Sequence, residues 1–94
     1  MSKTLKIIVE KPQEPRLVEL GVRSWPIGTK GVSTFDWQYD EKEICLFLEG
    51  DVTVQTPSGS VSFGKEDLVT FFKGLSCAWQ VKKPVRKHYR FGEA

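Results

Sequence analysis

The sequence predicts an all-β domain, a sandwich or barrel of short strands, with one short helix near its N-terminus. Val, Ile and Thr together number 20 and Ala only 2, a balance that favours strands over helices. Turn-forming Gly and Pro residues recur at intervals of roughly 8–12 residues, the spacing expected of all-β sandwiches and barrels. Between these turns the apolar residues alternate with polar ones, as in strands that bury one face.

The length of 94 residues predicts one domain over residues 1–94. A formal net charge of +2 is too small to argue for nucleic acid or anionic lipid as a partner. No apolar run approaches the roughly 18 residues of a membrane span, and the first residues lack the pattern of a secretory signal. We therefore expect a cytoplasmic protein that binds neither nucleic acid nor membrane.

The single helical segment is predicted at about residues 15–20, where Leu17, Val18 and Leu20 can face a core and Gly21 can end the helix. Strands follow from period-two alternation. The residues expected on the inner faces are Phe35, Trp37, Tyr39, Val52, Val54, Val61, Phe63, Cys77, Trp79, Val81, Val85, Tyr89 and Phe91.

Residues 44–48 and 68–72 are apolar on both faces. Such strands are covered on both sides, by the barrel interior on one side and by another element or another subunit on the other. Together with the need to protect exposed strand edges, this predicts a homodimer.

The chain holds one His, His88, and two Cys, Cys45 and Cys77. A single His excludes sites built on two or three imidazoles, which include most catalytic zinc and non-haem iron sites. Without a secretory signal, the two Cys are expected to be free thiols, although a disulfide is possible if the fold brings them together.

Two segments resemble the paired motifs of the cupin family. Residues 43–50 have a Glu followed, after six residues, by a Gly at a hairpin, within a first motif at about 35–50. Residues 66–81 resemble the second motif, in which an acidic residue opens a strand and a turn ends in Gly. The segments 24–27, 35–39, 74–77 and 84–89 are similar to small single-domain cupins related to ethanolamine-utilisation and ureidoglycine-aminohydrolase cupins. The resemblance implies a single jelly-roll barrel, the double-stranded β-helix of cupins.

Cupins commonly bind a divalent metal through two His before the motif-one Glu, that Glu, and a His in motif two. Here the Glu is Glu43, the two upstream positions are Trp37 and Tyr39, and the motif-two position is Cys77. Only one usual ligand survives, so the resemblance implies no metal site of the usual kind. An atypical site made of Glu43, Cys45, Cys77 and Tyr39 remains an alternative, since thiolates bind zinc or iron.

The orientation of Glu43 is ambiguous in the sequence. Hydrophobicity alone would turn Ile44, Leu46 and Leu48 inward, whereas the cupin resemblance turns Glu43, Cys45 and Phe47 into the barrel. We follow the resemblance. A buried unpaired carboxylate is costly, so Glu43 must be protonated, paired with a ligand, or hydrogen-bonded, with the Tyr39 hydroxyl as a candidate.

Five residues are candidates for a binding site in the barrel mouth: Trp37, Tyr39, Glu43, Cys77 and Trp79. Each also has a structural interpretation, because aromatic rings fill barrels and free Cys is often buried. Catalysis, if present, would use Glu43, Cys77 or His88. Alternation places His88 beside Arg86 and Arg90, on what we expect to be an exposed strand face.

Three functions remain open. The first is a metal-free cupin that binds a small polar metabolite in the barrel mouth. The second is a small cupin enzyme, a hydrolase, lyase or isomerase, that uses Glu43 with Cys77 or His88 and at most an atypical metal. The third is a dimeric structural or interaction module. Fold alone does not decide among them.

Overall fold

A computed structural model describes residues 7–92 as seven antiparallel strands, one α-helix and one turn of 3-10 helix. The all-β prediction is confirmed. In chain order the elements are β1 (Ile7–Glu10), α1 (Glu14–Leu20), η1 (Val22–Ser24), β2 (Ile27–Lys30), β3 (Ser33–Gln38), β4 (Glu43–Thr56), β5 (Gly59–Gly64), β6 (Leu68–Phe71) and β7 (Ser76–Phe91). In this part of the chain no helix is long and apolar enough to cross a bilayer.

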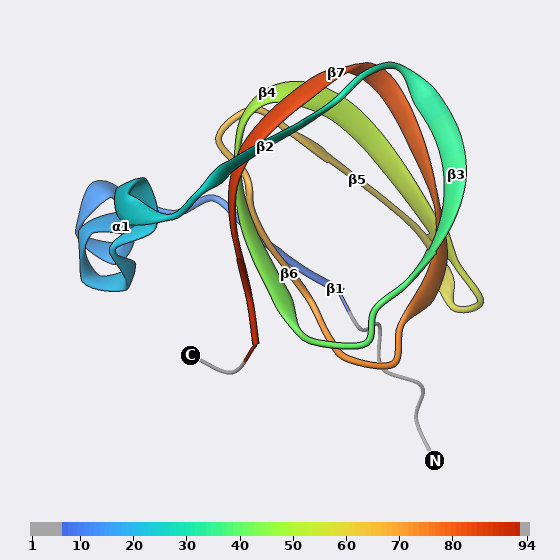
Figure 1. The fold of residues 1–94 in the computed structure, drawn as a ribbon, viewed down its shortest axis with the longest axis horizontal. Coiled ribbons are helices and arrows are strands. Elements are labelled where there is room, and N and C mark those ends of the chain that lie inside the picture. Colours follow the sequence, from blue (N-terminus) through green and yellow to red (C-terminus); the bar gives the residue numbers. More distant parts are fainter. Residues whose placement is uncertain (1–6, 93–94) are drawn as a thin grey trace.

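The two longest strands, β4 and β7, bend and contribute to both walls of the barrel. The first part of β4 lies between β6 and the last part of β7, and its second part lies between β5 and the first part of β7. β1 extends one wall beyond β6, while β2 and β3 border the last and first parts of β7. Figure 1 shows these strands curving around one interior, as in a jelly roll.

Gly50 lies at the bend of β4, where the register with β7 shifts. Its φ of +130° belongs to a region that side chains disfavour. A Cβ at this position would also lie 2.8 Å from Cγ2 of Val85. The sequence predicted this Gly at a hairpin, but it lies within β4, and the hairpin to β5 comes after Thr56. Glycine is needed at position 50 for both conformation and close packing.

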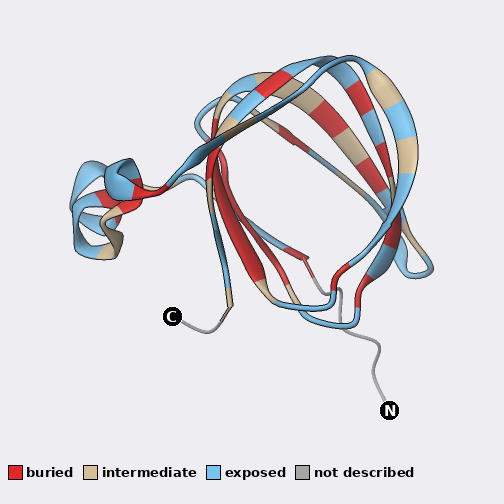
Figure 2. Cartoon of the chain, in the orientation of Figure 1, coloured by how far each residue is buried: buried red, intermediate tan, exposed pale blue. Residues whose placement is uncertain are grey.

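Buried residues occur along the strands and in the helical segment (Figure 2). Their side chains form two groups, an inner core and an outer core. The inner core fills the barrel with alternate residues of the strands, including Cys45, Phe47, Val69 and Phe71. The outer core lies on the other face of β4 and β6, where α1 and η1 cover it. Its members are Leu17, Val22, Trp25, Ile44, Leu46 and Leu68.

The outer core explains why residues 44–48 and 68–72 are apolar on both faces. The N-terminal segment of the same chain covers Ile44, Leu46 and Leu68 on the outer side, so these residues give no reason for a second subunit. Helix α1 ends where predicted: Gly21 has a left-handed φ of +68° and its N–H bonds to the carbonyls of Leu17 and Val18. Trp25 is also buried in this outer core.

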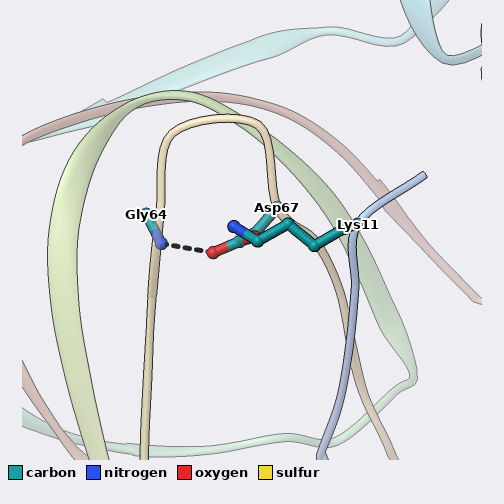
Figure 3. Close-up of polar contacts among 3 residues, drawn as sticks. All are labelled: Lys11, Gly64 and Asp67. Carbon is teal, nitrogen blue, oxygen red and sulfur yellow. Dashed lines mark hydrogen bonds and ion pairs between the residues drawn. The ribbon is translucent and has the colours of Figure 1, made fainter. Parts of the chain in front are cut away.

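The turn between β5 and β6 is held by Asp67 (Figure 3). Its Oδ2 accepts a hydrogen bond of 2.8 Å from the backbone N–H of Gly64, and its Oδ1 forms an ion pair with Lys11. Glu66 is the only residue other than Gly with positive φ, +73°, among residues 7–92. This left-handed conformation is one that side chains disfavour and glycine adopts readily.

Candidate functional site

A cavity of about 320 Å³ opens into the barrel between β2, β3, the start of β4 and β7. Half of its lining residues are aromatic, and its charged lining residues are one carboxylate and two lysines. The wall consists of Gly28, Thr29, Lys30, Phe35, Trp37, Tyr39, Glu43, Trp79, Val85, Lys87, Tyr89 and Phe91. The cavity therefore combines an apolar, ring-lined wall with a small number of charged groups, as small-molecule sites commonly do.

Glu43 points into the barrel and is only 4% exposed. Cys45 and Phe47 share its face and belong to the inner core, whereas Ile44 and Leu46 lie in the outer core. The orientation taken from the family resemblance is confirmed. Hydrophobicity could not decide it because α1 and η1 make the outer face as apolar as the inner one.

The partner of Glu43 is Lys87, on the facing part of β7. Lys87 Nζ lies 3.3 Å from Glu43 Oε2 and 3.5 Å from Cys45 Sγ. The side chains of Glu43 and Lys87 are 5% and 16% exposed, so this is a largely buried ion pair. The Lys87 ammonium also lies 5.1 Å from the ring centroid of Trp79 and 5.8 Å from that of Phe47, within the range of cation–π attraction.

Lys87 is the residue of the candidate site that the sequence did not predict. Residues 85, 87, 89 and 91 are alternate residues of one strand. The alternation that turns Val85, Tyr89 and Phe91 inward therefore turns Lys87 inward as well. A lysine in a basic, C-terminal strand is normally assigned to solvent. The signal was the combination of that inward parity with an unpaired inward carboxylate on a neighbouring strand.

Electrostatics keep Lys87 charged. Burial acts to lower its pKa, but the negative charge of Glu43 and the hydrogen bonds to Glu43 and Cys45 outweigh burial, and the pKa is raised. Burial raises the pKa of the Cys45 thiol, against the opposing effect of Lys87. Cys45 is therefore a neutral thiol at neutral pH, and Glu43 is the counter-ion of Lys87.

Tyr39 and Trp79 form the floor of the site within the inner core. The Tyr39 ring stacks on Phe71 with centroids 4.9 Å apart, and burial raises the pKa of its hydroxyl. Trp79 packs against Phe71 at 5.5 Å. Its Nε1 is buried beside Tyr39 and Cys77 without an acceptor in hydrogen-bonding geometry. Within residues 7–92 the Glu43 carboxylate accepts its hydrogen bond from Lys87, not from the Tyr39 hydroxyl we expected.

Trp37 differs from its prediction. It shares the cavity wall with Tyr39, but 48% of it is exposed, so it is not a residue of the barrel interior. The ring lies at the rim, edge-on to Tyr39 with centroids 6.3 Å apart. Residue 37 is one position from the end of β3, at the opening of the cavity.

Cys77 is buried but lies outside the cavity lining. Its Sγ contacts the Trp37 carbonyl at 3.6 Å, and burial raises the pKa of the thiol. Cys77 therefore lacks the stabilised thiolate that a nucleophile requires. Both cysteines are free thiols.

The expectation for His88 is wrong: the residue is only 8% exposed. Its Nδ1 lies 3.0 Å from the Trp25 carbonyl, and its neighbours across the ladders are Ile27 and Leu46. Because a carbonyl oxygen only accepts, Nδ1 is the donor. Alternation correctly turned His88 away from the barrel, but the outer face at this point is covered by the segment that holds Trp25.

The residues do not fit the metal that cupins commonly hold. The positions of the two upstream imidazoles carry Trp37, which has no ligating atom, and Tyr39, whose hydroxyl has a raised pKa. Across residues 7–92 no three His, Cys, Asp or Glu side chains gather in a group that could hold an ion. Glu43, Cys45 and Cys77 thus do not assemble the atypical site, and an ammonium already lies against the remaining carboxylate.

The bent antiparallel barrel and its ring-lined cavity define a cupin fold. The family model described as the EutQ-like cupin domain matches residues 17–89. The chain belongs to this family, which confirms the resemblance seen in its motifs. No curated protein matches the chain.

Three solved structures are similar to the chain. A DUF861 family protein from Thermotoga maritima shares 52% identity at a TM-score of 0.87, with 90% of this chain and 98% of that one covered. The EutQ protein of Clostridium difficile shares 24% identity at a TM-score of 0.65, covering 72% and 54%. A putative ethanolamine utilization protein Q from Salmonella typhimurium shares 23% at 0.63, covering 70% and 54%. The last two show likeness of fold alone.

Proposed function

We propose that this cupin binds a small polar metabolite in the ring-lined cavity and does so without a histidine-based metal site. The observation that carries the proposal is the Glu43–Lys87 ion pair in the cavity wall. Buried ion pairs contribute little to stability compared with well-packed apolar residues. This pair lies at the mouth of a cavity, where both groups can contact a ligand. Ligand binding explains why the pair is present there.

The second support is the nature of the wall. Aromatic rings supply large contact area, and two of them, Trp37 and Phe91, are 48% and 45% exposed. Exposed rings at the rim of a cavity lose water when a ligand enters, which favours binding. Lys87 also takes the role of the missing cation, because its ammonium neutralises the carboxylate that a metal would otherwise neutralise.

An enzyme that uses Glu43 with Cys77 or His88 is supported less well. His88 lies on the outer face and Cys77 lies outside the cavity lining, so neither meets Glu43 there. Ligand binding does not require Glu43 to lie beside Cys77 or His88. A ligand needs only the groups that already face the cavity.

The test is a thermal-shift screen of small acids, amides, amines and sugars with the wild type, Trp37→Ala and Ile27→Ala. Ile27 is 45% exposed, close to the 48% of Trp37, but pairs with His88 on the outer face. A ligand at a hundred times its dissociation constant stabilises by about 2.7 kcal/mol. We expect a hit that Trp37→Ala weakens and Ile27→Ala does not.

Metal content gives an independent check on the same protein. Elemental analysis of the purified wild type and of Glu43→Gln should give the same substoichiometric metal in both. A full equivalent of metal that is lost in Glu43→Gln contradicts the metal-free part of the proposal. No hit in the screen, or hits that Trp37→Ala leaves unchanged, contradict binding in this cavity.

A further inference from the structure

We infer that the ligand is an uncharged, flat molecule that carries a hydrogen-bond donor and an acceptor side by side, such as an aromatic amide. The inference rests on the proposed function and concerns the class of ligand. It follows from the charge balance of the cavity, from the hydrogen-bonding groups left without partners, and from the shape of the wall.

The buried charges in the cavity wall balance one another. Within the described lining, Glu43 and Lys87 face one another at 3.3 Å and cancel. The remaining charge, Lys30, is exposed at the rim with its Nζ 4.7 Å from the ring centroid of Phe35, so water screens it. A charged ligand beside the buried pair would lose its hydration without gaining a free counter-ion. A neutral ligand avoids this cost.

The hydrogen-bonding groups are the second step. A lysine ammonium has three N–H donors. Within residues 7–92, Lys87 donates to two acceptors, Glu43 Oε2 and the weaker acceptor Cys45 Sγ. Glu43 accepts from Lys87 through Oε2, which leaves Oε1 for a donor. The pair therefore offers a ligand one N–H and one carboxylate oxygen close together. A carbonyl adjacent to an N–H matches both.

The shape of the wall is the third step. The lining rings meet either nearly parallel or edge-on: Phe35 stacks with Trp79 at 5.8 Å, and Tyr89 meets Phe91 edge-on at 5.8 Å. Such rings favour a flat guest that offers a face to one ring and an edge to another. The cavity of about 320 Å³ is at the small end of ligand sites, which suits a single ring with one substituent.

The experiment compares three probes of the same shape and different charge: benzamide, benzoate and benzamidine. Titration calorimetry on the wild type should give the tightest binding for benzamide, by about ten-fold or more over each charged probe. The double variant Glu43→Gln/Lys87→Met removes both charges and should lower benzamide affinity. Ile27→Ala, on the outer face, is the control and should not.

Tighter binding of benzoate or benzamidine would overturn the inference and leave the proposed cavity function standing. Equal binding of all three would also overturn it. If none of the three binds, the inference fails. The wider thermal-shift panel then decides separately whether the proposed function fails with it.

Discussion

Lys87 Nζ lies 3.3 Å from Glu43 Oε2, on two strands that are hydrogen-bonded neighbours in the wall of the barrel. The two residues are 44 positions apart in the chain. Their pairing converts a buried carboxylate, which would be costly alone, into a neutral element of the cavity wall. The proposed ligand class depends on this pairing.

Breaking the pair should destabilise the fold strongly. Lys87→Met leaves the Glu43 carboxylate buried without a counter-ion, and we expect the free energy of unfolding in urea to fall by about 3–5 kcal/mol. Glu43→Gln/Lys87→Met should recover most of this loss, since no charge remains. The control is Arg23→Met, which breaks the exposed Arg23–Glu14 pair and should cost less than about 1 kcal/mol. Equal costs for the two single variants would contradict the buried pair.

Alkaline pH should destabilise the protein. The pKa values of Cys45, Cys77, Tyr39 and Lys87 are all raised in the folded state. A raised folded pKa gives a stability contribution that is complete below the unfolded pKa and is lost as pH rises toward the folded value. The loss should begin near pH 9, the ordinary pKa of the thiols, and continue past the ordinary values of 10.0 and 10.5 for Tyr39 and Lys87.

Urea unfolding at intervals from pH 7 to pH 11 measures this dependence. Cys45→Ala/Cys77→Ala should move the onset of the loss upward, toward the ordinary pKa of 10.0 of tyrosine. A free energy of unfolding that stays constant across this range would contradict the buried, neutral state of these groups.

Trp37 and Trp79 should differ in their effects on stability although both line the cavity. Trp79 is 4% exposed and in the inner core, so Trp79→Ala should lower the free energy of unfolding by about 3–5 kcal/mol. Trp37 is 48% exposed, and Trp37→Ala should cost less than about 1 kcal/mol. Urea denaturation of both variants distinguishes rim from core. A large loss for Trp37→Ala would show that the ring is a packing residue.

His88 should anchor the N-terminal segment from outside the barrel. His88→Leu leaves the Trp25 carbonyl without its donor, and we expect a cost of about 1–3 kcal/mol with faster amide exchange in residues 14–25. His88→Asn, which retains a donor, should restore part of the protection. Benzamide affinity should be the same in both variants, because His88 does not line the cavity. Loss of that affinity would contradict the outer position of His88.

Gly50 should not tolerate a side chain. Gly50→Ala places a Cβ 2.8 Å from Val85 Cγ2 at a φ of +130°, and we expect a loss of about 1–3 kcal/mol or more in urea unfolding. Gly31→Ala is the control, because no atom lies within 4 Å of its added Cβ and the change should stay within about 0.5 kcal/mol. If both variants are equally stable, the bend of β4 does not require glycine.

The homodimer remains a prediction. The outer core, in which Ile44 and Leu46 pack with Leu17 and Trp25 of the same chain, accounts for the apolar outer face of β4 without a second subunit, and the argument from exposed strand edges is untested. Sedimentation analysis of the wild type would measure the oligomeric state directly.

The sequence by itself determined the class of fold, the ends of the helix and the inner parity of most strands. Each of these depends on neighbours along the chain: Gly21 ends α1 through its own φ, and alternation turns Val85, Tyr89 and Phe91 inward because successive side chains point to opposite faces. The inward direction of Glu43 required the family resemblance as well, since local hydrophobicity favoured the opposite.

Only the tertiary structure decided which of these residues meet and what covers them. Lys87 reaches Glu43 because β7 returns beside β4, and His88 is buried because the segment around Trp25 crosses its face. Trp37 is exposed because β3 reaches its end at the rim. The pairing of Lys87 with Glu43 and the covering of His88 depend on contacts between segments distant in the chain. Period-two alternation predicts the face on which a side chain lies, but not which residues lie opposite that face.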